Sequence, residues 1–364
     1  MQSRLGLTTP EVAQLARELG IDKEWSELDL SGSAVGIHGA PLLHHALLKN
    51  TSLKTLILAR CQLVGEGSSK PLGAALEGNS RITSVDLSAN SLGPSGGVAF
   101  GRVMSTSLSL SSLSLADNVI GCEGAVALAA GLAENRALRL LELHGNSIGD
   151  VGCAHLARAL CGNENLNHLG LGSNDISGEG EGMEALAEAL KGKCQLTSLN
   201  LSRNPLGASG GAMLGTAVRV NSTLGTLKLA NSELGSEGAA KLCIALRGNR
   251  GLLTLVLSNN RIGPSACTNM RAALSANKTL ESLDLSNNSI APEGCIALMQ
   301  GLKNNISLCM LDLTANGIHA GLLNDVKIVM KHRMTEWMIQ KERGAKSSAG
   351  QGSEPSPQRC TSGA

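Results

Sequence analysis

The chain has 364 residues, a formal net charge of +1, 42% hydrophobic residues and only 1% aromatic residues. This charge excludes a nucleic-acid-binding protein that acts through bulk positive charge, and no apolar run is long enough for a transmembrane helix. The 44 glycines exclude a coiled coil, and leucine must fill the core in place of aromatic side chains.

The first 24 residues predict an N-terminal capping helix. Residues 8–20 carry Thr9 as the expected N-cap, Pro10 at the first helical position and Gly20 at the end. The apolar residues of this segment recur at helical spacing: Val12, Leu15 and Leu19. The segment lacks the apolar region of a signal peptide, so we expect an intracellular, cytoplasmic protein with reduced cysteines.

Residues 25–321 repeat one pattern every 28–30 residues. The motif LxxLxLxxN occurs, for example, as LSSLSLADN at 110–118 and LESLDLSNN at 280–288, and it predicts a short strand with one buried face. The segment IGxxGAxxLAxxL follows and predicts a helix. Because one strand and one helix cannot bury their apolar faces alone, about eleven units are expected to stack into an α/β solenoid with a parallel inner sheet and outer helices. The strand motifs start at residues 25, 53, 82, 110, 138, 166, 196, 224, 252, 280 and 308.

Two asparagines recur in the repeats. The first follows the strand, as at Asn118, and we expect its buried amide to bond turn backbone in its own and the neighbouring repeat. The second ends the helix, as at Asn135, and we expect it to adopt the left-handed conformation of a helix C-cap. Three residues replace the first asparagine in single repeats: Ser33, Cys61 and Ser232.

Alternate strand residues face the concave side of the predicted sheet, and most of them are short, polar or acidic. Asp284 and Asp312 are expected on adjacent strands about 5 Å apart. Such a pair is either a hydrated pair of like charges or one end of a groove for a Lys- or Arg-bearing partner. His144 and His168 are expected at different heights, which argues against a shared ligand set. The candidate partner-binding residues of this face are Asp29, Asp86, Glu142, His144, His168, Asn200, Lys228, Asp284 and Asp312.

Residues 322–344 predict a basic amphipathic helix with Leu322, Val326, Met330 and Trp337 on one side. This helix either covers the last repeat or docks onto another molecule. In the second case its candidate docking residues are Lys331, Arg333 and Trp337. Residues 345–364 are rich in Ser, Gly and Pro and are expected to be disordered.

The sequence contains no P-loop, no nucleophile elbow and no paired-cysteine metal motif. We therefore predict no catalytic residue, cofactor, metal site or small-molecule substrate. The repeat over about residues 25–320 resembles the ribonuclease-inhibitor-like class of leucine-rich repeats, which is found in ribonuclease inhibitor, NOD-like receptors, Ran GTPase-activating protein and several axonemal proteins. The resemblance implies a right-handed α/β horseshoe and a non-catalytic scaffold that binds a protein, not a nucleic acid or a membrane.

The resemblance leaves two alternatives open. A GTPase-activating protein similar to the Ran activator would need a residue such as Arg60 near the transition state. That family typically has a strongly acidic tail, whereas residues 345–364 contain Glu354 as their only acid. A cytoskeletal role as an axonemal or ciliary structural subunit, or a regulator related to NOD-like receptors, is implied by class resemblance alone.

Overall fold

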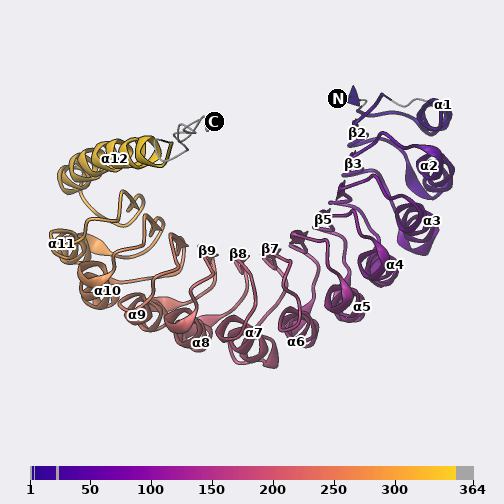
Figure 1. Ribbon diagram of the computed structural model, residues 1–364. Coiled ribbons are helices and arrows are strands. Elements are labelled where there is room, and N and C mark those ends of the chain that lie inside the picture. The colour runs from indigo at the N-terminus through magenta and orange to yellow at the C-terminus, as the bar shows by residue number, and fades with distance from the viewer. Residues whose placement is uncertain (1, 4, 22–23, 350–364) are drawn as a thin grey trace, which may run out of the picture.

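The computed structural model describes residues 2–3, 5–21 and 24–349. These residues form a curved solenoid with the strands on the inner, concave side and the helices outside (Figure 1). The described strands form one parallel sheet of twelve, ordered along the chain from β1 to β12. The predicted leucine-rich repeat solenoid is therefore confirmed, and β1 adds one short strand at the edge.

The strands are β1 (Gln2–Ser3), β2 (Glu27–Asp29), β3 (Thr55–Ile57), β4 (Ser84–Asp86), β5 (Ser112–Ser114), β6 (Leu140–Glu142), β7 (His168–Gly170), β8 (Ser198–Asn200), β9 (Thr226–Lys228), β10 (Thr254–Val256), β11 (Ser282–Asp284) and β12 (Met310–Asp312). The helices are α1 (Thr9–Leu19), α2 (Gly36–Lys49), α3 (Gly65–Gly78), α4 (Gly93–Thr106), α5 (Gly121–Glu134), α6 (Gly149–Leu160), α7 (Glu181–Lys191), α8 (Gly207–Val220), α9 (Gly235–Leu246), α10 (Pro264–Ala276), α11 (Ala291–Leu302) and α12 (Ala320–Ala349).

The N-terminal helix α1 is capped by Thr8, so the prediction of Thr9 as the cap was wrong. The backbone N–H and the hydroxyl of Thr8 donate to Glu11 Oε2 at 2.8 and 2.6 Å. Glu11 is three residues after Thr8, as a capping box requires, whereas the Thr9 hydroxyl donates to the carbonyl of Ala34. The apolar side of α1 is buried, as predicted, at Val12, Leu15 and Leu19.

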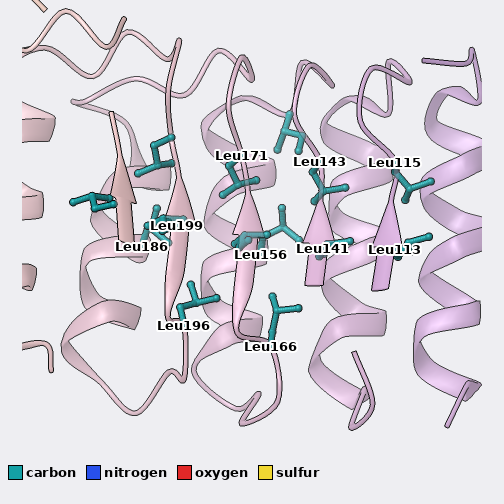
Figure 2. Packing of buried hydrophobic residues seen from close by; sticks show 14 of the residues in the cluster. Leu113, Leu115, Leu141, Leu143, Leu156, Leu166, Leu171, Leu186, Leu196 and Leu199 are labelled. Carbon is teal, nitrogen blue, oxygen red and sulfur yellow. The ribbon is translucent and has the colours of Figure 1, made fainter. Parts of the chain in front are cut away.

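The core is one continuous seam of leucines between the sheet and the outer helices. In β5 and β6 the side chains of Leu113 and Leu141 point inward and are fully buried. Figure 2 shows how leucines from neighbouring strands stack on those of the helices behind them, such as Leu156. Each repeat therefore depends on the repeats beside it to keep its leucines out of water.

The asparagine that follows each strand joins successive repeats, as predicted. Asn118 Nδ2 donates to the carbonyl of Leu115 in its own repeat at 3.1 Å and to that of Leu87 in the preceding repeat at 2.9 Å. The side-chain oxygen of Asn146 in the next repeat accepts from the N–H groups of Asn118 and Ile120 at 3.0 and 3.1 Å. This first asparagine ladder satisfies turn backbone that the solenoid buries.

The asparagine at the helix end does not adopt the left-handed conformation, and that prediction was wrong. Asn135 has φ −67° and ψ 139°, which is extended backbone. Its Nδ2 donates to the carbonyl of Met104 at the end of the previous helix, at 2.6 Å. Its Oδ1 accepts from the N–H groups of Ala137 and Leu138 at 3.0 and 2.7 Å. These residues form a second asparagine ladder, in which the amide bridges two helix ends.

The last helix, α12, leaves the row of outer helices and crosses the end of the solenoid (Figure 1). Val326 and Met330 are buried against the last repeat. The helix extends on both sides of the predicted range 322–344, and residues 350–364 of the predicted disordered tail lie outside the described residues. Within the described ranges, no helix combines the length and the apolar character that crossing a membrane requires.

Candidate protein interface

The predicted acidic residues of the concave face also have a local structural role. Asp284 Oδ1 accepts from the backbone N–H and the hydroxyl of Ser286 at 2.9 and 2.7 Å. Asp312 Oδ1 accepts from the N–H of Thr314 at 2.9 Å. Each aspartate thus fixes the turn at the end of its strand. The same bond to the residue two positions later is made by Asp29, Asp86 and Asn200.

Sequence reasoning missed this turn role, although a signal for it was present. An Asp or Asn followed two positions later by Ser or Thr recurs at the end of these strands. In Asp284 and Asp312 the bonds to the turn use only Oδ1. The second carboxylate oxygen of each residue is therefore not part of these turn bonds. It can accept a hydrogen bond from a bound partner.

Asp284 and Asp312 are directly opposite each other in the register of β11 and β12, as predicted. In the part of the chain that the structure describes, neither carboxylate forms an ion pair. Like charges directly opposite each other on a sheet destabilise it. A positive group placed between the two carboxylates would remove this repulsion.

A hollow of about 490 Å³ adjoins this acid pair where α12 crosses the end of the concave face. Lys331 lines it from α12, so the structure brings together predicted residues from the sheet and from the terminal helix. Thioether side chains are flexible and adapt to the shape of a bound group. The methionines that line the hollow are Met310, Met330 and Met334.

A second group of predicted residues lies in the middle of the concave face, on β6 and β7. His168 Nε2 lies 2.5 Å from Glu142 Oε1. The glutamate side chain lies over Gly170, where an added Cβ would come within 1.6 Å of Glu142 Oε2. His144 pairs with a different acid, and its Nε2 lies 3.7 Å from Asp117 Oδ1.

The two histidines thus contact separate carboxylates, and the described residues contain no cluster of three His, Cys, Asp or Glu side chains that could hold a metal ion. Lys228 is exposed on β9, opposite Asn200 and Val256 in the sheet register. The nine candidates are therefore spread along the concave face, from Asp29 on β2 to Asp312 on β12, and do not form one site. Arg60 follows β3 in a left-handed conformation with φ 56°.

The buried thiols of Cys153 and Cys243 are poor nucleophiles. Burial raises the pKa of the Cys153 and Cys243 thiols to about 12, so both are protonated at neutral pH. Cys153, Cys267 and Cys295 occupy the repeat position where Ala125 or Ala239 is found in other repeats, and all three are fully buried, as that small apolar position predicts. Cys161, in contrast, is exposed at the end of α6.

The three predicted docking residues of α12 have different surroundings. Lys331 is exposed at the concave hollow. Arg333 donates to the carbonyls of Leu302 and Leu308 at 2.5 and 3.4 Å and to Asn305 Oδ1 at 3.5 Å. Desolvation lowers the pKa of Arg333 from its usual value. Trp337 is half-buried and lines a different hollow, beside the loop that follows α11.

Comparison with known proteins gives the following similarities. A family profile described as "Leucine Rich repeat" matches residues 78–101, 106–129, 193–215, 220–243 and 276–299. No curated protein matches the sequence. Among solved structures, leiomodin-1 actin-binding site 2 is 21% identical, with 44% of this chain and 95% of that chain covered and a TM-score of 0.41. An internalin (inlF) from Listeria monocytogenes is 19% identical, with 80% and 75% covered and a TM-score of 0.45.

The five matched segments lie in different parts of the chain. The strands between and beside them continue one sheet without interruption, each paired in parallel with the next. The first asparagine ladder also runs through segments that the profile does not match, for example at Asn146 and Asn174. The profile match and this repeating geometry together show that the chain contains leucine-rich repeats and has the α/β solenoid fold that such repeats form.

Proposed function

We propose that this chain is a non-catalytic protein-interaction scaffold, and that its concave face binds a Lys- or Arg-bearing segment of a partner protein at Asp284 and Asp312. The observation that carries the proposal is the acid pair beside a methionine-lined hollow at the end of the sheet. We further propose a cytoplasmic location, which the thiols buried in the repeats support.

Both the apolar stem and the charged end of a basic side chain would find matching groups in this hollow. The aliphatic stem of lysine or arginine packs on apolar surface while its charged end reaches polar groups. Here the stem would lie on Met310 and Met334, and the charged end would reach Asp284 and Asp312. A hydrogen bond to a charged group contributes about 1.5–3 kcal/mol. Lys331 at the rim would repel a second positive charge and so favours a partner in which the basic residue is isolated.

The test replaces both aspartates by asparagine, as Asp284→Asn with Asp312→Asn. Asparagine keeps the turn bond, since Asn200 Oδ1 already accepts from the Ser202 N–H at 3.0 Å, but it removes the charge. Asp86→Asn is the matched control because Asp86 makes the same turn bond farther along the face. Full-length wild type and variants are used to capture proteins from a cell extract, and the captured proteins are quantified by mass spectrometry.

We expect the wild type and the Asp86→Asn variant to capture a partner saturably. The double variant is expected to capture at least tenfold less of that partner. Equal capture by the double variant and the wild type would show that the acid pair is not the binding site. A measured catalytic turnover, together with no saturable protein partner, would overturn the scaffold function itself.

A further inference from the structure

We propose that the chain has a second docking surface, on the other side of α12, which binds an acidic amphipathic helix of a partner protein. This inference deepens the proposed scaffold function and rests on it, but it uses different residues. The surface is a hollow of about 820 Å³ between α12 and the loop Lys303–Ile306 that follows α11. We call this hollow the end groove.

The end groove is lined by large apolar side chains that face solvent. Ile306 is 85% exposed, Ile328 60% and Ile339 44%. At the position of Ile306, one and two repeats earlier, the chain has Lys278 and Arg250. Several exposed apolar residues that line one hollow are typical of a binding surface, whereas single exposed ones are not.

The charges around the end groove favour an acidic partner. Lys303, His332 and Arg333 line it, and Glu336 is the acid among its lining residues. The Glu336 carboxylate is already next to a histidine, since its Oε2 lies 3.6 Å from His332 Nδ1. The rim therefore attracts carboxylates and disfavours a basic segment, which is the opposite preference to that of the concave hollow.

The length of the groove fits a short helix. Its lining residues on α12 run from Ile328 to Ile339, about 16 Å or three helical turns. An amphipathic helix that lies along a groove of this kind inserts apolar residues at positions i, i+3 or i+4, and i+7. Acidic residues on the flanks of that helix would then face Lys303.

The residues that follow α12 in this sequence do not supply this occupant. Residues 350–364 contain no Leu, Ile, Val, Met, Phe or Trp, so they cannot fill an apolar groove. The concave hollow is also separate from the end groove, because it is lined from α12 by Met330, Lys331 and Met334. A partner could therefore occupy each hollow independently.

The first part of the test uses the full chain and a synthetic 16-residue peptide. The peptide has leucines at i, i+3, i+4 and i+7 and glutamates at most other positions. One control peptide replaces the glutamates by lysines, and another scrambles the leucine positions. Trp25 and Trp337 are the two tryptophans of the sequence, so in a Trp25→Phe background the fluorescence of Trp337 reports directly on the end groove.

We expect the glutamate peptide to shift the Trp337 emission saturably, with a Kd in the micromolar range, and both control peptides to bind at least tenfold more weakly. Equal binding of the lysine peptide would overturn the proposal, and so would no shift at millimolar peptide. A shift that depends on protein concentration without any peptide would show that a second copy of the chain fills the groove, which also overturns it.

The second part of the test uses variants. Ile306→Asp and Ile328→Asp are expected to weaken binding of the glutamate peptide at least tenfold. Leu108→Asp is the matched control, because Leu108 is 89% exposed and occupies the position of Ile306 in an earlier repeat. Full affinity of Ile306→Asp, or equal weakening by Leu108→Asp, would contradict the proposed groove. The asparagine variants of Asp284 and Asp312 are expected to bind the peptide normally, so failure of the concave site and failure of the end groove give different results.

Discussion

At the scale of single residues, the first asparagine ladder explains why a turn with little regular structure can be buried in every repeat. Asn146 Nδ2 donates to Leu143 in its own repeat and to Leu115 in the preceding one, both at 2.9 Å. Its Oδ1 accepts from Asn118 and Ile120. One amide therefore satisfies donors and acceptors that would otherwise be buried without partners.

Replacing this amide is expected to destabilise the protein strongly. Asn146→Ala leaves two N–H donors unsatisfied, at about 1–3 kcal/mol for each group, so we expect a loss of about 3 kcal/mol in the free energy of unfolding. Asn146→Ser also removes the acceptor for these N–H groups, but it is expected to lose less than Asn146→Ala because it keeps a donor. Ser232, at the equivalent position of another repeat, donates to the carbonyls of Leu201 and Ala230 at 3.5 and 3.3 Å.

Urea unfolding followed by circular dichroism measures both variants of Asn146. Asn304→Ala is the control, since Asn304 is an exposed asparagine near a helix end. If Asn146→Ala and Asn304→Ala unfold at the same urea concentration, the ladder does not have the stabilising role that its bonds imply.

At the scale of whole elements, α12 ends the solenoid by continuing the second asparagine ladder with a different residue. Asn305 Nδ2 donates to the carbonyl of Leu274, 31 residues earlier. Arg333 donates to the carbonyl of Leu302, also 31 residues earlier, and it is 28 residues after Asn305. Arg333 therefore takes the position in the repeat that an asparagine has in earlier repeats. Its side chain is longer than that of asparagine, so it reaches the same kind of carbonyl from the middle of a helix.

This contact predicts a specific effect of Arg333→Ala. Loss of the charge-assisted bonds to Leu302 and Leu308 is expected to destabilise the junction between α11 and α12 by about 1.5–3 kcal/mol. Hydrogen exchange followed by mass spectrometry is expected to show at least tenfold faster exchange in peptides from both helices. Lys331→Ala is the control on the exposed side of α12, and comparable exchange in the two variants would contradict a capping role for Arg333.

The period of the sequence was sufficient to predict the repeat elements, but not the direction of the helix after the last repeat. Leucine spacing predicts each strand and its buried face, because burial of one sheet face requires that alternation. It does not show that α12 crosses the end of the sheet. The hollow that joins Asp312 to Lys331, and the end groove beside Ile306, both depend on that crossing and were therefore not predictable.

The second asparagine ladder was misread for a related reason. A helix followed by asparagine is typical of a left-handed cap, and the local sequence around Asn135 contains nothing against it. Two local bonds from the N–H groups of Ala137 and Leu138 to Asn135 Oδ1 accompany the extended backbone. The Met104 carbonyl, which is close only after the repeats have stacked, binds the other end of the same amide.

At the scale of the whole molecule, the solenoid is stabilised by contacts between neighbouring repeats. Each strand from β2 to β11 is paired on both sides, whereas β12 is paired only with β11 among the described strands. In such an array stability is approximately the sum of repeat and interface contributions, so repeats near an end open more often than central ones. The buried cysteines are placed to report this difference, because they occur in central and in terminal repeats.

We therefore predict a gradient of thiol reactivity along the chain. Burial raises the pKa of Cys153, in the central helix α6, to about 12, and it also raises the pKa of Cys295 in α11. At pH 8 both thiols are protonated and shielded, so iodoacetamide reacts with them only when their repeats open. We expect exposed Cys161 to react first, then Cys295, and Cys153 at least tenfold more slowly than Cys295, as measured by mass spectrometry of labelled peptides over time. If Cys153 and Cys295 react at the same rate, the chain opens as one cooperative unit and neighbour contacts alone do not account for its stability.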